Sequence, residues 1–226
     1  MRHRLIPRSI LWLFCSIFAV IPCANATTIA HMTEAQLIEH SSLIVRGRVL
    51  RKQSKWNPQR TAIITQVQFQ VHQEVLGRPT PSVVVIGHYG GQVGNERMGL
   101  PNGPNFTVGE EIVVFLHTSK HLPGEYLLTG WTQGIWNISR PELEISPYSS
   151  TPPKAFIYRS IPSQMLYYPS KLKHKYQVNQ NTTAQTLQSF IGRLQQTWKQ
   201  LQLKRKAKAS AQVLKSKQVQ NKPVQK

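Results

Sequence analysis

The sequence contains no aspartate: all nine of its acidic residues are glutamates. Hydrolase triads that use an aspartate, and cation sites built from aspartate carboxylates, are therefore excluded. The sequence also lacks the Gly-x-Ser-x-Gly nucleophile elbow, the Gly-x-x-x-x-Gly-Lys phosphate loop and the His-Glu-x-x-His zinc helix. We therefore predict a protein without catalytic residues and without a cofactor.

Cysteine is almost absent: Cys15 and Cys23 are the only two, and both lie near the N-terminus. The residues around them follow the order of a cleavable signal peptide, with arginines first, then an apolar run over 10–21 and the small-residue triplet 24–26. The run has twelve residues, whereas a membrane-spanning helix needs roughly 18 or more. We predict that residues 1–26 are removed on export to the periplasm or the medium. The mature chain then has no disulfide and no transmembrane anchor.

Acidic residues are also missing from the whole C-terminal part. Residues 27–144 hold ten basic residues and all nine acids, whereas residues 145–226 hold fifteen basic residues and no acid. A near-neutral domain is thus followed by a cationic extension, which predicts binding to an anionic polymer or an acidic membrane surface. A solvated extension without a partner is the alternative. The expected anion-binding residues are Lys199, Lys204, Arg205, Lys206, Lys208, Lys215 and Lys217.

The near-neutral domain, residues 27–144, has the pattern of a mainly β fold. A capping box that begins at Thr33 predicts a helix of about two turns. Residues 43–50 predict a strand with a bulge or bend at Gly47, and the turn 56–59 follows. Apolar and polar residues then alternate over 63–72, which is the clearest strand pattern in the sequence.

Further strands follow in the same domain. Two short apolar runs, 83–86 and 112–116, predict buried strands, and 126–129 with 135–138 predict a hairpin across 132–134. Five or six short strands with one helix favour a small antiparallel β-barrel of the oligonucleotide/oligosaccharide-binding (OB-like) type or the netrin-like type. An open β-sandwich is the alternative fold.

Beyond this domain the pattern loosens. Residues 145–181 are rich in proline and tyrosine and predict an extended linker. A second capping box, at Thr182 with Gln185, begins a predicted amphipathic helix over 182–208 that packs on the barrel. The tail 209–226 has little to bury, so we expect it to be disordered. The apolar stripe of the helix consists of Leu187, Phe190, Ile191, Leu194, Trp198 and Leu201.

Several segments of the domain resemble a family of secreted bacterial β-rich domains to which no activity is assigned. They are SLIVRGRV (42–49), FQVHQEVLG (69–77), the pair Gly90-Gly91, FTVGEEIVVFL (106–116) and TQG (132–134). The resemblance covers residues 33–138 and includes a C-terminal helix. It implies an exported barrel of OB-like or netrin-like character without catalytic residues, and it does not account for the lysine-rich tail.

The long loop 87–109 is the first candidate ligand site. It is rich in glycine, and glycines let backbone N–H groups approach an anion. A ligand loop would then use His88, Gly90, Gly91 and Gly94. Tight turns at the barrel rim are the simpler explanation for the same glycines.

A metal site is the weaker candidate. His117 and His121 are four residues apart and could share a zinc ion on a helix, but they follow a strand and lack a third ligand. His72 and His88 could supply one after folding, but a single histidine on a strand is more often a surface residue. We therefore predict no metal site.

Together these features predict an exported, non-enzymatic binding or structural module whose basic extension associates with an anionic component of the cell envelope. A barrel that binds a protein partner, similar to the netrin-like protease inhibitors, is one alternative. A metal-dependent hydrolase is the other.

Overall fold

The structure is a computed structural model that describes residues 29–99, 103–119, 122–140, 155–159, 166–167 and 185–220. Side chains are described for these residues except 166, 167 and 213–220. The predicted signal peptide, residues 1–26, and most of the predicted linker, residues 145–181, lie outside the described residues. None of the helices in the described ranges combines the length and the apolar character needed to cross a membrane.

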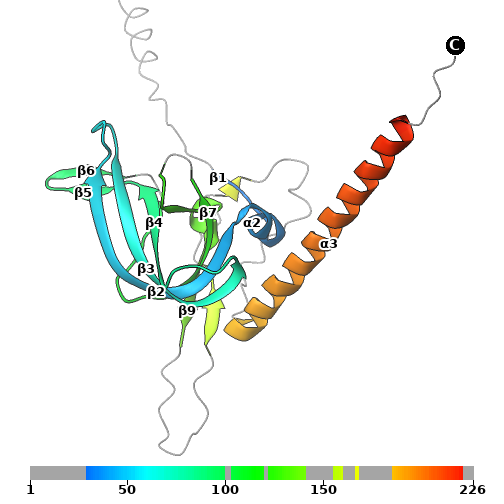
Figure 1. Cartoon of the computed structure of the whole chain (residues 1–226). Helices are drawn as coiled ribbons and strands as arrows, with labels where there is room; N and C mark the ends of the chain where they lie inside the picture. The colour runs from blue at the N-terminus through cyan, green and yellow to red at the C-terminus, as the bar shows by residue number, and fades with distance from the viewer. Residues whose placement is uncertain are drawn as a thin grey trace, which may run out of the picture.

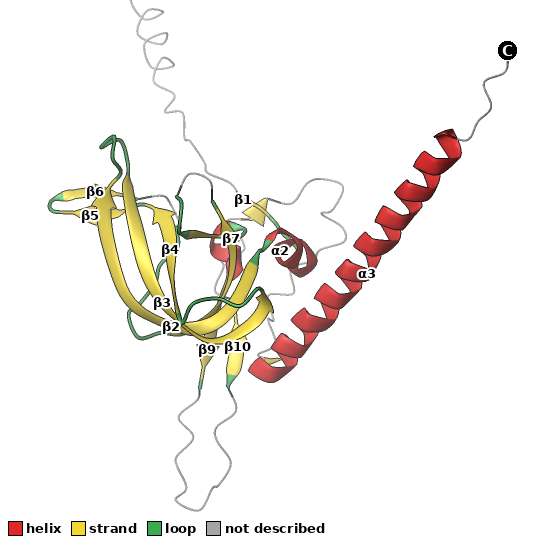
Figure 2. Cartoon of the chain, viewed as in Figure 1, coloured by secondary structure: helices red, strands yellow, loops and turns green. Residues whose placement is uncertain are grey.

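The chain is mainly β, with one short and one long helix (Figures 1 and 2). In chain order the elements are β1 (Ile29–Ala30), α2 (Glu34–His40), β2 (Leu43–Trp56), β3 (Ile63–Gly77), β4 (Val83–Tyr89), β5 (Gly91–Val93), β6 (Glu96–Met98), β7 (Glu111–Thr118), β8 (Tyr126–Leu128), the 3₁₀ helix η1 (Trp131–Gly134), β9 (Ile135–Ser139), β10 (Phe156–Tyr158), β11 (Leu166–Tyr167), β12 (Gln185–Thr186) and α3 (Leu187–Gln220).

Five strands close a ring in the order β2, β3, β4, β8, β7 and back to β2. The predicted small barrel is therefore confirmed over the β-sandwich. Every pairing in the ring is antiparallel except β4 with β8, which registers Ile86 with Tyr126 in parallel. A purely antiparallel barrel is not possible here, because strand direction cannot alternate around a ring with an odd number of strands.

The long β2–β3 pair forms the frame of the barrel. Its turn is held by Asn57, whose side-chain Oδ1 accepts from the backbone N–H of Thr61 at 2.8 Å and of Ala62 at 3.1 Å. The pairing register shifts between Arg46 and Gly47. A Cβ at Gly47 would lie 1.9 Å from the carbonyl oxygen of Gln70, so the bend there requires glycine. The predicted bulge at Gly47 and the predicted turn are both confirmed.

The apolar run of β7 serves two cores at once. Ile112, Val114 and Leu116 belong to the core inside the barrel, whereas Val113 and Phe115 belong to a second core that includes residues of α2 and α3. A strand buried on both faces reads as a continuous apolar run, as the sequence of β7 does. Figure 2 shows α2 and α3 together on one side of the strands.

The predicted hairpin over residues 126–138 is wrong. β8 pairs with residues 116–118 of β7 and β9 pairs with residues 112–114, both antiparallel and on the same side. The two strands therefore run in one direction, and η1 joins them without reversing the chain. Gln133 holds η1 in place between the two strands. Its fully buried side chain accepts from the N–H of Met32 and donates to the carbonyl of Ala30.

The predicted loop 87–109 is also partly wrong. β4 continues to Tyr89, and β5 and β6 form a small antiparallel hairpin within the expected loop. Strands of three residues are too short to show a recognisable period in the sequence. β10, in the predicted linker, pairs with β9, and β12, within the predicted helix 182–208, pairs with β10, so the sheet extends beyond the boundary expected at residue 144.

The C-terminal helix differs from its predicted bounds at both ends. It begins at Leu187, because Gln185 and Thr186 belong to β12 and the Thr186 hydroxyl accepts from the N–H of Ser189. It continues to Gln220, so the expectation of disorder from residue 209 is wrong as far as residue 220. Alanine, lysine, glutamine and leucine dominate this stretch and are strong helix formers, which favours the continuation of the helix. Residues 221–226 lie outside the described residues.

Candidate functional site

The first turns of α3 fix the helix to the barrel. Phe190 and Leu194 are fully buried, and the Phe190 ring packs on Trp136 with ring centroids 4.5 Å apart. Arg193, on the same part of the helix, pairs with Glu34 of α2. The prediction that the apolar stripe packs on the barrel is confirmed for Leu187, Phe190, Ile191 and Leu194, whereas Trp198 is 39 % exposed.

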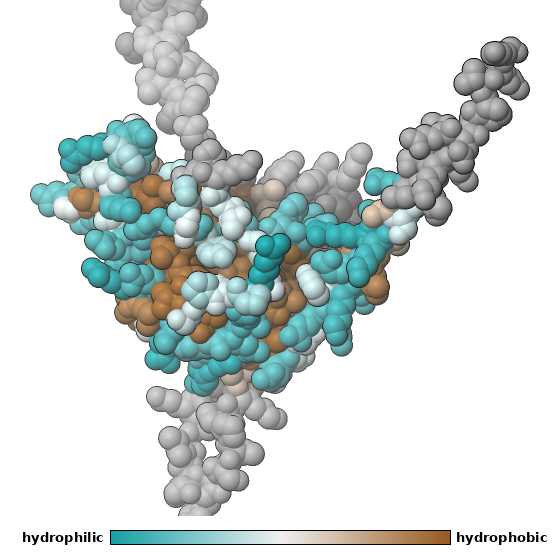
Figure 3. Space-filling model, in the orientation of Figure 1, coloured by the Kyte–Doolittle hydropathy of each residue, from teal (hydrophilic) through white to brown (hydrophobic). Residues whose placement is uncertain are grey.

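The second part of α3 leaves the barrel and is cationic. All side chains described from residue 203 to 212 are exposed, and Figure 1 shows the helix pointing away from the strands. Lys204, Arg205, Lys206 and Lys208 lie in this segment, and Lys199 is exposed just before it. Figure 3 shows hydrophilic residues along the exposed side of α3. The structure thus presents these five predicted anion-binding residues to solvent. Lys215 and Lys217 lie in α3, beyond the described side chains.

The cations do not form one face of the helix. Successive residues turn by about 100°, so the consecutive Lys204, Arg205 and Lys206 point in three directions. Leu203, which is 67 % exposed, is the one large apolar side chain that the structure describes between residues 203 and 212, and a membrane-inserting face needs several. Within the described residues, the one carboxylate paired with this segment is Glu39, 3.3 Å from Arg205, in an exposed ion pair. The cations from Lys199 to Lys208 cover more than half of the helix circumference and leave one uncharged strip, which holds Leu203, Ala207 and Ala211.

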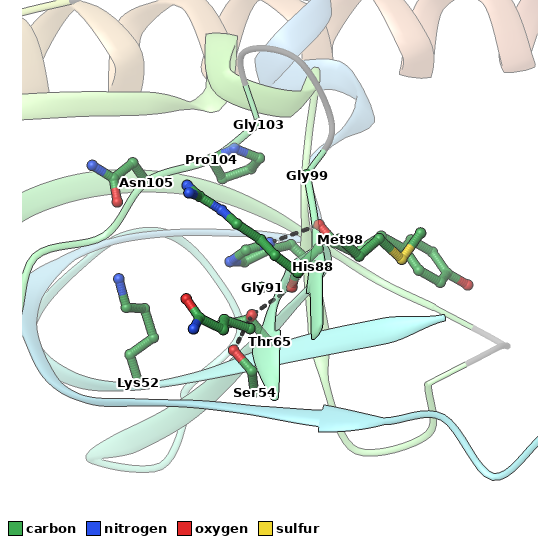
Figure 4. Close-up of a pocket in the computed structure, with 14 residues that line it drawn as sticks. Lys52, Ser54, Thr65, His88, Gly91, Met98, Gly99, Gly103, Pro104 and Asn105 are labelled. Atoms are coloured by element: carbon green, nitrogen blue, oxygen red, sulfur yellow. Dashed lines mark hydrogen bonds between the residues drawn. The ribbon is translucent and has the colours of Figure 1, made fainter. Parts of the chain in front are cut away.

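A cavity of about 590 Å³ lies beside the barrel, between the ends of the long strands and the β5–β6 hairpin. Figure 4 shows Lys52, Ser54, Thr65 and His88 around this space. Among the described residues, the lining consists of Lys52, Ser54, Thr65, His88, Tyr89, Gly90, Gly91, Gln92, Arg97, Met98, Gly99, Gly103, Pro104 and Asn105.

Hydroxyl groups and glycines form one wall of the cavity. The Thr65 hydroxyl donates to the carbonyl oxygen of Gly90 at 2.6 Å and lies 2.9 Å from the Ser54 hydroxyl. Gly90 and Gly91 have φ angles of 101° and 138°, which favour glycine. A Cβ at Gly91 would lie 2.4 Å from both hydroxyl oxygens, so glycine there lets the hairpin approach the wall.

The part of the lining that the structure describes contains two cations, Lys52 and Arg97, and no carboxylate. The Lys52 ammonium donates to the carbonyl oxygen of Phe106 at 3.0 Å, and neither Lys52 nor Arg97 forms an ion pair with a carboxylate of the described residues. The positive charge of Lys52 acts on the carboxylate of Glu110, which is not among the lining residues. Burial raises the pKa of Glu110, and hydrogen bonds from Thr107 and the charge of Lys52 oppose that rise. The lining is therefore net positive.

His88 forms a buried part of the cavity wall. It is 9 % exposed, its Nδ1 lies 3.0 Å from the carbonyl oxygen of Tyr89, and its ring packs on Phe106 with centroids 5.8 Å apart. Burial lowers the pKa of His88, the charge of Lys52 lowers it further, and the bond to Tyr89 opposes both. His88 is therefore a neutral imidazole whose Nδ1 carries the proton, which leaves Nε2 as an acceptor. Within the described residues Nε2 has no hydrogen-bond partner.

The structure brings three of the four predicted ligand-loop residues to one place. His88, Gly90 and Gly91 line the cavity, whereas Gly94 lies in the turn of the β5–β6 hairpin and does not. Sequence analysis missed Lys52 and Ser54, because the predicted strand ended at residue 50 and β2 continues to Trp56.

The histidines considered as metal ligands do not come together. The Nδ1 of His117 lies 3.3 Å from the Thr129 hydroxyl, and His121 lies outside the described residues. In the ranges that the structure covers, no three histidine, cysteine or acidic side chains lie close enough to share a metal ion.

Sequence analysis also missed an ion-pair cluster at the start of β7. Glu110 lies in the turn before β7, where its carboxylate accepts from the N–H of Thr107 at 2.8 Å. Glu111 instead lies in β7, with 7 % of its side chain exposed, and pairs with Arg46 at 2.6 Å and with Arg140. This cluster ties β2, β7 and the end of β9 together.

Comparison with known proteins gives no relative: no protein-family model matches the sequence, and no curated protein matches it. The resemblance to secreted bacterial β-rich domains therefore stays a prediction.

Proposed function

We propose that this protein is an exported, non-enzymatic binding module whose α3 helix holds the barrel to an anionic component of the cell envelope. The observation that carries the proposal is the exposed cationic segment around Lys204 to Lys208, on a helix without any acidic residue. The first turns of the same helix are buried against the barrel. A surface that binds the cations would therefore hold the barrel as well.

The charges of this segment are available for a partner. The Arg205–Glu39 pair has both side chains about half exposed, 52 % and 45 %, and an exposed pair contributes little to stability. Each lysine near an acidic membrane surface contributes about 1 kcal/mol. The uncharged strip of the described segment holds a single large apolar side chain, Leu203, which favours contact with phosphate headgroups over insertion between lipid chains.

Vesicle binding tests this proposal. The protein is titrated with vesicles that contain phosphatidylglycerol, and with neutral vesicles, at low and at high salt. The triple variant K204Q, K206Q, K208Q removes three charges and keeps good helix formers, so binding to acidic vesicles should weaken by about 3 kcal/mol, roughly a hundredfold. Binding of the unmodified protein should also fade as salt increases.

A charge-matched control comes from β2. Arg48, Arg51 and Lys55 are exposed, so R48Q, R51Q, K55Q removes the same net charge from the barrel. This variant should bind acidic vesicles nearly as the unmodified protein does. An equal loss in both variants would contradict a role for α3. Equally tight binding to duplex DNA would contradict an envelope partner.

A further inference from the structure

We propose that the cavity beside the barrel binds a small hydroxylated anion, such as a phosphorylated or carboxylated sugar, between Lys52 of β2 and Arg97 of β6. This site is separate from the cationic segment of α3, since none of the α3 side chains that the structure describes lines the cavity. The same module would then bind a soluble ligand in the cavity and an anionic surface through α3.

The charge of the lining selects an anion. Lys52 and Arg97 come from different strands, and their positive charges are not neutralised by a carboxylate in the lining. The ammonium of Lys52 uses one of its three protons on the carbonyl oxygen of Phe106. Its remaining protons and the guanidinium N–H groups of Arg97 can donate hydrogen bonds to a phosphate or carboxylate.

The hydroxyl wall selects a ligand that also donates hydrogen bonds. The single proton of the Thr65 hydroxyl is used on the carbonyl oxygen of Gly90. The bond between Ser54 and Thr65 must then be donated by Ser54, which leaves the Ser54 oxygen as an acceptor in the lining. A ligand hydroxyl is the matching donor, so an anion without hydroxyl groups would satisfy only half of the site.

The size and rigidity of the cavity suit a ligand of this kind. A volume of about 590 Å³ lies within the range of roughly 300 to 1,000 Å³ that is typical of small-molecule sites. Glycine at position 91 brings the hairpin against the two hydroxyls, and the buried ring of His88 packs behind them against Phe106. These contacts form the wall before any ligand arrives.

Calorimetric titration with four probes tests the proposal: glucose 6-phosphate, galacturonate, glucose and inorganic phosphate. We expect glucose 6-phosphate or galacturonate to bind at least tenfold more tightly than glucose or inorganic phosphate. Whichever of the two binds more tightly identifies the anionic group. K52Q and R97Q should each weaken this binding about tenfold or more, the loss expected for one charge-assisted contact. The amide resonances of Gly90 and Gly91 should shift on titration.

Lys55 provides the matched control. It lies on the same strand as Lys52 and is similarly exposed, but it does not line the cavity, so K55Q should bind within twofold of the unmodified protein. Equal binding of all four probes, unchanged binding by K52Q and R97Q, or shifts confined to α3 would each overturn the proposal. The α3 triple variant should bind the sugar ligand normally, so failure of either proposal can be recognised without reference to the other.

Discussion

Arg193 of α3 contacts both carboxylate oxygens of Glu34 in α2, with its Nε 3.0 Å from Oε1 and its Nη2 2.8 Å from Oε2. The two residues are 159 positions apart in the sequence. This bidentate pair, together with the apolar core beneath it, fixes the direction in which α3 leaves the barrel.

A double-mutant cycle with E34Q and R193M should give a coupling energy of about 0.5 to 1 kcal/mol in urea unfolding. The value is modest because 42 % of the Arg193 side chain is exposed and water screens the pair. The cycle separates this coupling from the effect of Glu34 on the helix dipole of α2. A coupling energy of zero would contradict a specific contact.

Two glycine-to-alanine substitutions should change stability in opposite directions. G47A places a Cβ 1.9 Å from the carbonyl oxygen of Gln70, and this overpacking should lower the free energy of unfolding by at least about 2 kcal/mol. G192A lies in α3 with no atom within 4 Å of its Cβ, so it should raise the free energy of unfolding by about 0.5 to 1 kcal/mol. Urea unfolding measures both. A neutral G47A would show that the bulge tolerates a side chain.

Glu111 should make stability depend on pH in the acid range. Burial alone would raise its pKa, but hydrogen bonds from Arg140 and Arg46 outweigh burial, so its pKa lies below the usual value of 4.5. The stabilisation is thus fully present above the unfolded-state value and is lost as pH falls through the lowered value. E111Q should lower the free energy of unfolding by about 1 to 3 kcal/mol at neutral pH, and by less in acid.

Glu96 is the control for this prediction, because it is exposed and forms no ion pair with the described residues. E96Q should unfold like the unmodified protein at both pH values. If the deficit of E111Q were the same in acid and at neutral pH, the ion pairs would not be its cause.

Lys52 should contribute to the lowered pKa of His88. Burial is the larger cause of the lowered pKa of His88 and the charge of Lys52 is a smaller one. K52Q should therefore raise the pKa of His88 and still leave it below 6.5. Proton NMR of the imidazole rings measures this. The pKa of His117 is lowered by burial and by His40, so it should not change in K52Q, and an equal change in both rings would argue against a local effect.

The parts of the fold that could be predicted from the sequence are those fixed by local patterns. The capping box at Thr33 is present, with the side chain of Thr33 accepting from Gln36 and the side chain of Gln36 accepting from the backbone of Thr33. The alternating residues of β3 and the apolar run of β7 lie in strands as expected. Each of these signals depends on neighbours within a few residues.

The parts that could not be predicted depend on pairing between distant segments. β8 and β9 look like a hairpin in the sequence, and only their common partner β7 shows that they run in the same direction. The cavity has the same origin, since Lys52 and Arg97 are brought together by the β5–β6 hairpin. The glycines of the loop were recognisable as a candidate site, but the cations opposite them were not.

The charge of α3, which is all of one sign, also affects the interaction between copies of the protein. The helix carries eight lysine and arginine residues and no acid, so two such helices laid side by side would find only repulsion. Self-assembly through this helix is therefore disfavoured until counter-charges neutralise it. On a crowded surface, the spacing between molecules would follow from mutual repulsion and ionic strength, and the size of the barrel would set only its lower limit.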